Sequence, residues 1–238
     1  MSWLKEKIKD VIARFRVEKF GVKTYAQCGE DIVVRFLFNS MGIYRPSYLE
    51  LGTYHPILGN NTFLFYRYGS RGVCVEADRN LIREIRRYRV EDKILNIGVA
   101  TGDAQSADFY IFNEPSLNTF SRDEAMERER NGSYKVLAVE NVILQSITQI
   151  IKENFDSFPD FLSIDIESLD LEVIRTLDFS LHPIPIICVE TCTYSENHIK
   201  HRNPEIQEYF KSQDYFAYAD TYINTIFVNK RWFYGAKQ

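Results

Sequence analysis

The chain alternates short apolar runs with segments of helical periodicity from about residue 47 to residue 229. Runs such as "SYLELG", "GVCVEA", "FLSID" and "IICVE" are typical of buried strands. Between such runs, apolar residues recur at helical spacing, as at Leu81, Ile82 and Ile85. Strand, helix and strand in this order predict right-handed crossovers and a parallel sheet, so the fold class is α/β.

The same pattern places the individual elements. Strands are expected at residues 47–52, 72–77, 94–100, 107–112, 134–144, 161–165, 186–190, 215–220 and 224–229. Helices are expected at residues 61–68, 80–89, 144–153, 169–177 and 205–211. The polar stretch 116–133 has no clear apolar face, so we expect a hairpin-like excursion with a mobile loop there, a common place for a substrate lid.

Domain organisation follows from the absence of Pro/Gly-rich linkers and repeats. We expect one full-sized α/β domain over residues 47–238, with a helical extension at residues 1–46 packing on it. Residues 1–20 form an amphipathic pattern with Lys and Arg between the apolar positions, which suits a membrane surface or a partner. The favoured interpretation is packing on its own domain or on a sister subunit of a homo-oligomer. The segment has no apolar run long enough for a signal peptide or a stable membrane insertion.

Composition narrows the classes of function. At 238 residues with 45% apolar content, the chain can bury a full core, which excludes a wholly disordered protein. The net charge of -4 and the pI near 5.7 give no basic field, which weighs against binding of nucleic acid. Four cysteines show no disulfide or zinc pattern, so a cytoplasmic location is the natural expectation.

Polar residues end the predicted strands, where ligands bind in open parallel sheets. These residues are Glu50, Gly52, Glu76, Asp78, Gly98, Asp165, Glu167 and Glu190. Gly52 permits a tight turn, and Glu76 follows it by 24 residues, as does the acid that binds the ribose of an adenosine cofactor. The loop "GTYHPILGNN" is not G-x-G-x-x-G, so the spacing alone leaves nucleotide binding and a plain turn open.

An ordered set of motifs extends over residues 24–229. The set is "YAQCGEDIVV", "YLELGTYHPILGNNTFLFY", "GVCVEADRNLI", "LNIGVA", "FLSIDIESLDLEVI", "IICVET" and "ADTYINTIFV". Together they resemble the FkbM-type family of S-adenosylmethionine-dependent methyltransferases. The resemblance implies a Rossmann-like class I methyltransferase sheet of seven strands, with the last strand antiparallel. The chain departs from the family pattern at Ser168, where glycine is usual, and in a glycine loop reduced to Gly52 and Gly59.

The resemblance also implies how the cofactor is held. Gly52 and its loop would pass under the methionine part, and Glu76 would hold the ribose. Residues 96–99 and Asp78 would flank the adenine, and two residues near the N-terminus would close over the cofactor. The full set of expected cofactor-binding residues is Gln27, Glu30, Glu50, Gly52, Glu76, Ala77, Asp78, Asn96 and Gly98.

The activity implied is O-methylation of a sugar hydroxyl in a nucleotide-linked or polysaccharide precursor, with S-adenosylmethionine as donor. Two other interpretations stay open at this point. A nicotinamide-dependent oxidoreductase is motivated by the Gly52 to Glu76 spacing, and a non-catalytic partner-binding domain is motivated by the N-terminal helix.

The acids after the strand at 161–165 raise a question of charge. Asp165 and Glu167 share a face if the strand continues, and Glu190 ends the neighbouring strand. Repulsion among three acids would be relieved by a shared proton or by Mg²⁺ or Mn²⁺, so these three are the expected metal ligands. Asp165, Glu190 and His55 are the expected catalytic residues, with His55 as a base or substrate contact. Alternatively, only Asp165 faces the crevice and orients the amino group of the cofactor.

Overall fold

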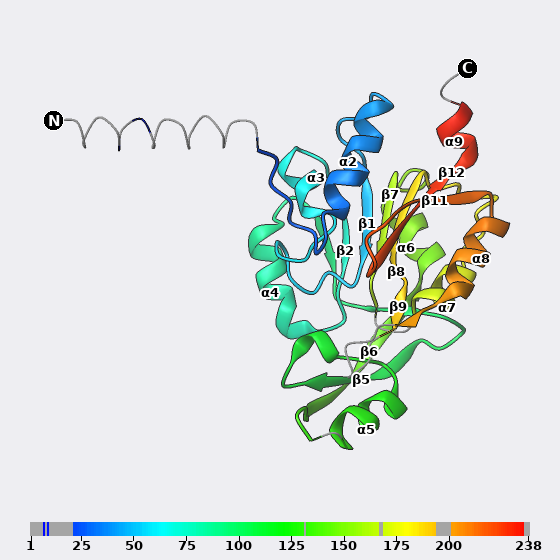
Figure 1. Cartoon of the computed structure of the whole chain (residues 1–238). Coiled ribbons are helices and arrows are strands. Elements are labelled where there is room, and N and C mark those ends of the chain that lie inside the picture. Colours follow the sequence, from blue (N-terminus) through cyan, green and yellow to red (C-terminus); the bar gives the residue numbers. More distant parts are fainter. Residues whose placement is uncertain are drawn as a thin grey trace.

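The computed structural model describes residues 7, 9, 21–130, 132–166, 169–193 and 201–235. Within these residues, seven strands form a central sheet in the order β11-β12-β8-β7-β1-β2-β3 (Figure 1). They are β1 (Tyr48–Leu51), β2 (Gly72–Val75), β3 (Lys93–Leu95), β7 (Phe161–Ile164), β8 (Ile186–Glu190), β11 (Tyr215–Asp220) and β12 (Asn224–Asn229). β12 is antiparallel to both of its neighbours, and the other pairings are parallel. The predicted class I methyltransferase sheet with an antiparallel last strand is confirmed.

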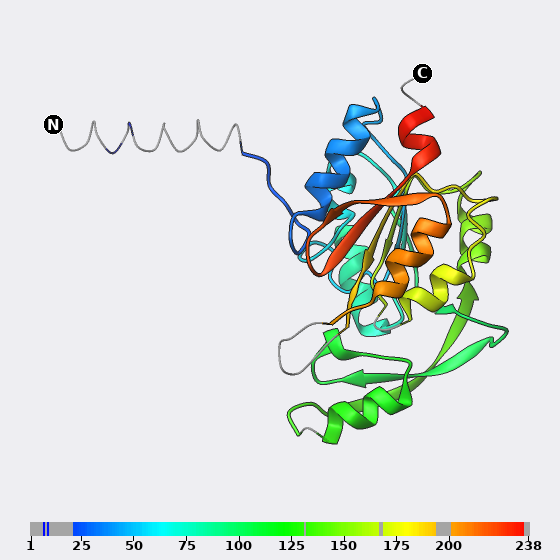
Figure 2. The same cartoon turned by 45° about the vertical axis from the view of Figure 1, so that its right-hand side comes forward.

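Helices cover both faces of the central sheet, because alternate residues of each strand point to opposite sides. They are α2 (Glu30–Ser40), α3 (Phe63–Arg67), α4 (Arg79–Tyr88), α6 (Ile147–Asn154), α7 (Asp170–Arg175) and α8 (Pro204–Ser212). Leu49 and Leu51 of β1 share one buried cluster with α6, α7 and α8. Tyr48 of the same strand shares the opposite cluster with α2, α3 and α4. The core therefore has three layers, α/β/α (Figure 2).

The prediction of one strand at residues 94–100 was wrong, because a second, smaller sheet takes part of this run. In the structure this run is divided between β3 of the central sheet and β4 (Gly98–Ala100), which pairs with β6 (Val136–Ser146). β5 (Ser106–Phe112) completes this sheet as the predicted hairpin partner of β6. The division occurs at Asn96, whose Nδ2 donates to the carbonyls of Glu76 and Ala77 at 2.9 Å each. The Asn96 side chain thus satisfies two carbonyl groups just after β2, at the point where residues 96–97 leave the central sheet.

The polar stretch after β5 is also more regular than predicted. It contains the short 3-10 helix η1 (Pro115–Leu117) and helix α5 (Arg122–Arg130) in place of an irregular loop. Leu117 and Ala125 are buried together, and the largely buried Arg128 donates to the carbonyl of Leu117. Arg128 therefore holds this segment in place. Its burial could not be predicted, because it stands among exposed polar residues in the sequence. A role for the segment as a substrate lid stays a prediction.

Helix α2 joins the N-terminal part of the described chain to the core. Its residues Val34, Leu37 and Phe38 pack on the central sheet, whereas most of the amphipathic segment at residues 1–20 lies outside the described residues. The boundary predicted between residues 46 and 47 stays a prediction. Helix α9 (Lys230–Gly235) and the short pair β9 (Cys192–Thr193) and β10 (His201–Arg202) were not predicted. In the described part of the chain, every helix is too short or too polar to cross a bilayer.

Candidate functional site

A cavity of about 330 Å³ opens at the carboxyl ends of β1, β2, β7 and β8. β1 lies between β2 and β7, so the strand order reverses here, which is where ligands bind in open α/β sheets. Residues 115–120 of the second sheet's connection form the opposite wall. The predicted site residues that line the cavity are Gln27, Glu50, Gly52, Glu76, Ala77, Gly98, Asp165 and Glu190. Its volume falls within the usual range of small-molecule sites, roughly 300–1,000 Å³.

Gly52 forms the tight turn that closes β1. Its φ is +82°, and a Cβ built on it would lie 1.7 Å from the carbonyl oxygen of Asp165. The N–H groups of Gly52 and Thr53 both donate to the carbonyl of Val75 at 3.1 Å, and the N–H of Asp165 donates to Leu51 at 3.0 Å. The ends of β1, β2 and β7 are thus held together at a point that only glycine can occupy.

Glu76 is a buried carboxylate at the end of β2. Its Oε1 accepts from the N–H of Asp78 and its Oε2 from the N–H of Tyr54, both at 2.8 Å. Burial raises the pKa of Glu76 to about 7, and the hydrogen bonds from these backbone N–H groups oppose part of that rise. Tyr54 reaches the carboxylate with a φ of +50°, a strained conformation for a bulky residue. A carboxylate placed in this way is suited to accept hydrogen bonds from a ligand diol.

The raised pKa of Glu76 makes the stability of the fold depend on pH. The pKa of Glu76 is raised above its ordinary 4.5, so protonation of this carboxyl group favours the folded state. This contribution to the unfolding free energy is fully present below pH 4.5 and is lost as pH rises through about 7. Between pH 4 and pH 8, the wild type should lose about 3 kcal/mol of unfolding free energy relative to Glu76→Gln, because the glutamine side chain does not titrate. Urea denaturation of both proteins at several pH values measures this difference. The exposed variant Glu84→Gln sets the baseline, and a difference that does not change with pH would contradict the assignment.

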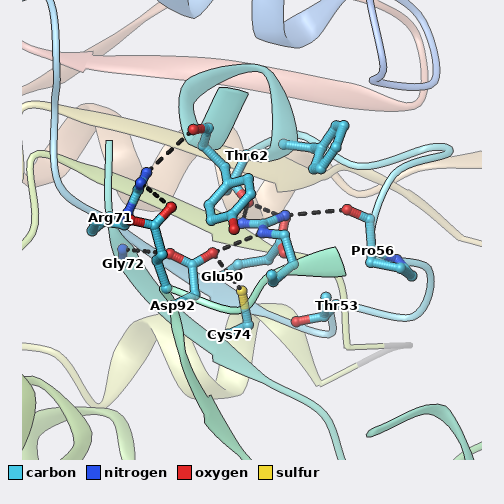
Figure 3. Close-up of polar contacts among 12 residues, drawn as sticks. Glu50, Thr53, Pro56, Thr62, Arg71, Gly72, Cys74 and Asp92 are labelled. Carbon is cyan, nitrogen blue, oxygen red and sulfur yellow. Dashed lines mark hydrogen bonds and ion pairs between the residues drawn. The ribbon is translucent and has the colours of Figure 1, made fainter. Parts of the chain in front are cut away.

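Glu50 is the second buried carboxylate at the cavity. Its Oε2 accepts from Nδ2 of Asn60 at 3.0 Å. Its Oε1 accepts from Oγ1 of Thr62, also at 3.0 Å (Figure 3). Burial raises the pKa of Glu50, whereas the positive charge of Arg89 lowers it. Glu50 is therefore fixed in orientation by the loop that follows Gly52.

Asp165 and Glu190 end neighbouring strands. β7 and β8 pair in the register Ile164 with Val189, so the two acids follow adjacent strand ends and both line the cavity. Glu167, the third predicted ligand, lies outside the described residues. Within the described ranges, no group of three or more His, Cys, Asp or Glu residues could hold a metal ion. A metal site that includes Glu167 stays a prediction.

Glu30 lies away from the cavity wall and has structural partners. Its Oε1 accepts from Nδ2 of Asn224 at 3.0 Å and from Oγ1 of Thr221 at 2.6 Å. Its Oε2 accepts from the N–H of Cys28 at 2.8 Å. These contacts join the beginning of α2 to the turn between β11 and β12, and they hold the segment that carries the cavity residue Gln27.

Asp78 and Asn96 support the cavity from behind. Asp78 caps α4 by accepting from the N–H of Asn80 at 2.8 Å, and its other oxygen accepts from Nδ2 of Asn118 at 2.9 Å. Asn118 lines the cavity, so Asp78 links the central sheet to the opposite wall. Neither Asp78 nor Asn96 is among the described residues that line the cavity.

His55 contributes to the loop after Gly52. Its Nδ1 accepts from the N–H groups of Ile57 and Leu58 at 3.0 and 2.8 Å. These contacts occupy Nδ1, and the role of His55 as a base or substrate contact stays a prediction.

Several cavity residues were missed in the sequence. An apolar wall is formed by Leu81, Ile97, Phe109, Leu117 and Phe120. The buried Asn61 donates from Nδ2 to Oγ of Ser163 at 3.1 Å, and its Oδ1 has no hydrogen-bond partner within the described structure. Phe109, Leu117 and Phe120 come from β5 and from its connection to β6. The pattern of apolar residues did not predict that this connection returns over the strand ends.

This strand order, with one antiparallel strand, is that of the class I methyltransferase fold, and the cavity lies at its ligand-binding edge. The chain belongs to the methyltransferase FkbM domain family, whose profile matches residues 50–217. The family membership confirms the resemblance seen in the sequence and sets aside the oxidoreductase interpretation. A search of curated proteins found no match.

Solved structures with a similar arrangement are distant in sequence. An O-methyltransferase from Bacillus cereus in complex with SAH is 12% identical, over 93% of this chain and 89% of that chain, with a TM-score of 0.41. Magnesium protoporphyrin IX methyltransferase from Synechocystis with bound SAM is 9% identical, over 87% and 85% of the chains, with a TM-score of 0.41. A 1,6-didemethyltoxoflavin-N1-methyltransferase from Burkholderia thailandensis is 11% identical, over 95% and 87%, with a TM-score of 0.40.

Proposed function

We propose that this methyltransferase transfers a methyl group from S-adenosylmethionine to a hydroxyl of a sugar or nucleotide-linked sugar. The observation that carries the donor half is Glu76, a buried carboxylate at the cavity whose hydrogen bonds come from the N–H groups of Tyr54 and Asp78. The acceptor class follows from the resemblance to the FkbM-type family. A small-molecule partner also suits the volume of the cavity.

The lining of the cavity fits the three parts of the donor. Glu76 is the proposed ligand of the ribose hydroxyls. The apolar wall that contains Leu81, Ile97 and Phe109 is the proposed adenine site, because a purine face packs well on such side chains. Glu50 and the turn at Gly52 are the proposed neighbours of the methionine part, where a carboxylate complements an ammonium group.

The chemistry requires one proton acceptor. The donor supplies an electrophilic methyl group whose bond to sulfur breaks as a bond to the acceptor oxygen forms, leaving S-adenosylhomocysteine and a methyl ether. Asp165 is the proposed base that takes the hydroxyl proton on a carboxylate oxygen. Glu190 ends the adjacent strand, and a neighbouring negative charge favours proton uptake by such a pair.

Calorimetry with S-adenosylhomocysteine tests the donor site. We expect the wild type to bind and Glu76→Ala to bind roughly 10- to 150-fold more weakly, because a charge-assisted hydrogen-bond pair contributes on the order of 1.5–3 kcal/mol. Glu84→Ala makes the same chemical change on the exposed face of α4 and should bind like the wild type. Equal affinity of a folded Glu76→Ala variant would move the ribose elsewhere. No binding by the wild type at high micromolar ligand would refute the proposed function.

A further inference from the structure

A fully buried arginine lies behind the cavity. Arg89 follows the end of α4, and its side chain has no exposed surface. Its Nε donates to Oδ2 of Asp92 at 2.7 Å, Nη1 to Pro56 O at 3.3 Å and Asn60 Oδ1 at 3.1 Å, and Nη2 to Tyr48 Oη at 3.1 Å and Thr62 Oγ1 at 2.7 Å. All five N–H donors of the guanidinium therefore have an acceptor.

The acceptors show which part of the fold Arg89 organises. Pro56, Asn60 and Thr62 belong to the segment between β1 and α3, which follows Gly52 and forms one side of the cavity. Figure 3 labels Pro56 and Thr62 of this segment, and their hydrogen bonds are drawn as dashed lines. Arg89 itself is not among the described residues that line the cavity. It therefore acts on the site through this loop and without a surface facing the ligand.

The hydrogen bonds of Arg89 help to set the direction of two further hydrogen bonds. Oδ1 of Asn60 accepts from Arg89 and from the backbone N–H groups of Thr62 and Phe63, so the amide must present its Nδ2 to Oε2 of Glu50. Oγ1 of Thr62 also accepts from Arg89, which leaves its own proton to donate to Oε1 of Glu50. Asn60 and Thr62, which bridge Arg89 and Glu50, consequently both present donors to the Glu50 carboxylate. This arrangement favours the ionised form of Glu50.

The charges around Glu50 include one cation among several acids. Arg89 lowers the pKa of Glu50 that burial raises, and Asp92 raises it further. The buried thiol of Cys74 also interacts with Glu50 and with Arg89. The cavity itself adds three more acids, which are Glu76, Asp165 and Glu190. Without Arg89, the loss of a positive charge and of oriented donors would leave a buried carboxylate among acids, where the protonated form is favoured.

We propose that Arg89 is a positioning residue of the donor site, which keeps Glu50 ionised and oriented through Asn60 and Thr62. This inference rests on the proposed function, since an ionised Glu50 matters because it faces the positively charged methionine part of the donor.

The coupling can be measured without any ligand. The variant Arg89→Met/Asp92→Asn removes the buried pair together and so leaves no isolated buried charge. Carbon-13 NMR of the Glu50 carboxyl, assigned with Glu50→Gln, follows its ionisation with pH. We expect titration at clearly higher pH in the double variant than in the wild type, and partial recovery in Arg89→Lys, which keeps the positive charge. An unchanged titration would overturn the proposal.

A double-mutant cycle on affinity for S-adenosylhomocysteine tests the consequence for binding. At pH 7 the double variant should bind roughly tenfold more weakly, and the loss should shrink as the pH is raised and Glu50 ionises. The same change in a Glu50→Gln background should alter affinity much less, whereas equal losses in both backgrounds would refute action through Glu50. If the double variant does not fold, Thr62→Val removes one bridge at nearly constant volume and enters the same cycle. The NMR result stands even if the wild type binds no donor, so failure of the proposed function is seen separately.

Discussion

Gly52→Ala is expected to destabilise the fold by more than about 4 kcal/mol and to abolish donor binding. The new Cβ would lie 1.7 Å from the carbonyl oxygen of Asp165, an atom of the backbone at the end of β7 that cannot rotate away. The φ of +82° adds strain, because an L side chain rarely adopts it. Relief requires β1 and β7 to separate where they form the floor of the cavity.

Gly59→Ala is the matched control, because Gly59 lies in the same loop with a φ of +66° and no heavy atom within 4 Å of the position that a Cβ would take. Only the conformational strain remains there, on the order of 1–2 kcal/mol. Urea denaturation followed by circular dichroism, with calorimetry on the folded fraction, compares the two variants. Similar losses at both positions would show that close packing at Gly52 is not what holds the strand ends together.

The central sheet could be predicted because its strands are buried on both faces. Each such strand reads as a short apolar run, as in "FLSID" and "IICVE", and helices such as α4 and α6 are long enough to show their own period. The acids and Gly52 stand out at the ends of these runs for the same reason. Their position at the carboxyl ends of β1, β2, β7 and β8 then follows from the parallel order.

The place of β4 in the second sheet could not be predicted in the same way. The apolar run at 94–100 is continuous in sequence, yet Asn96 divides it between two sheets by bonding to carbonyls after β2. The helix α5 was missed because its anchor to Leu117 is the buried Arg128, which resembles the exposed arginines beside it in sequence. A periodicity of apolar residues carries no information on either contact.

The supporting residues of the site show the same limit. Arg89 stands in "REIRRYR", where three further arginines make the run typical of a solvated helix face, and only the fold brings it under Glu50. Glu30 was expected at the cofactor, yet its carboxylate is bonded to Thr221 and Asn224, which are distant in sequence. Long-range polar partners depend on the tertiary arrangement, so local patterns predict the acid without predicting what it binds.

Asp165→Asn is expected to reduce turnover by about 10²- to 10⁴-fold, the usual contribution of a positioned proton acceptor. The assay measures release of S-adenosylhomocysteine with a sugar or nucleotide-sugar acceptor identified by screening. Asparagine keeps the size of the side chain but cannot take up the hydroxyl proton. If Asp165 is the base, affinity for S-adenosylhomocysteine should change little while turnover falls.

The variant should lose donor affinity as well as turnover if Asp165 has the other role considered for it. If it orients the amino group of the donor, the variant should bind S-adenosylhomocysteine more weakly, by roughly the tenfold or more that a charge-assisted hydrogen bond contributes. Asp103→Asn, an exposed change in the turn before β5, is the control for loss of an acid elsewhere. Full turnover in Asp165→Asn would show that the acids at the ends of β7 and β8 are misassigned.

Treatment with a chelator distinguishes proton transfer to a carboxylate alone from proton transfer that a metal ion assists. Asp165 and Glu190 line the same cavity, and an oxygen-rich pair of acids suits Mg²⁺ or Mn²⁺ if Glu167 joins them. With a metal, EDTA treatment should abolish turnover and added Mn²⁺ should restore it, whereas the donor affinity set by Glu76 should be largely kept. If the treated enzyme retains full turnover and Mn²⁺ changes nothing, the proton passes to Asp165 without a cation.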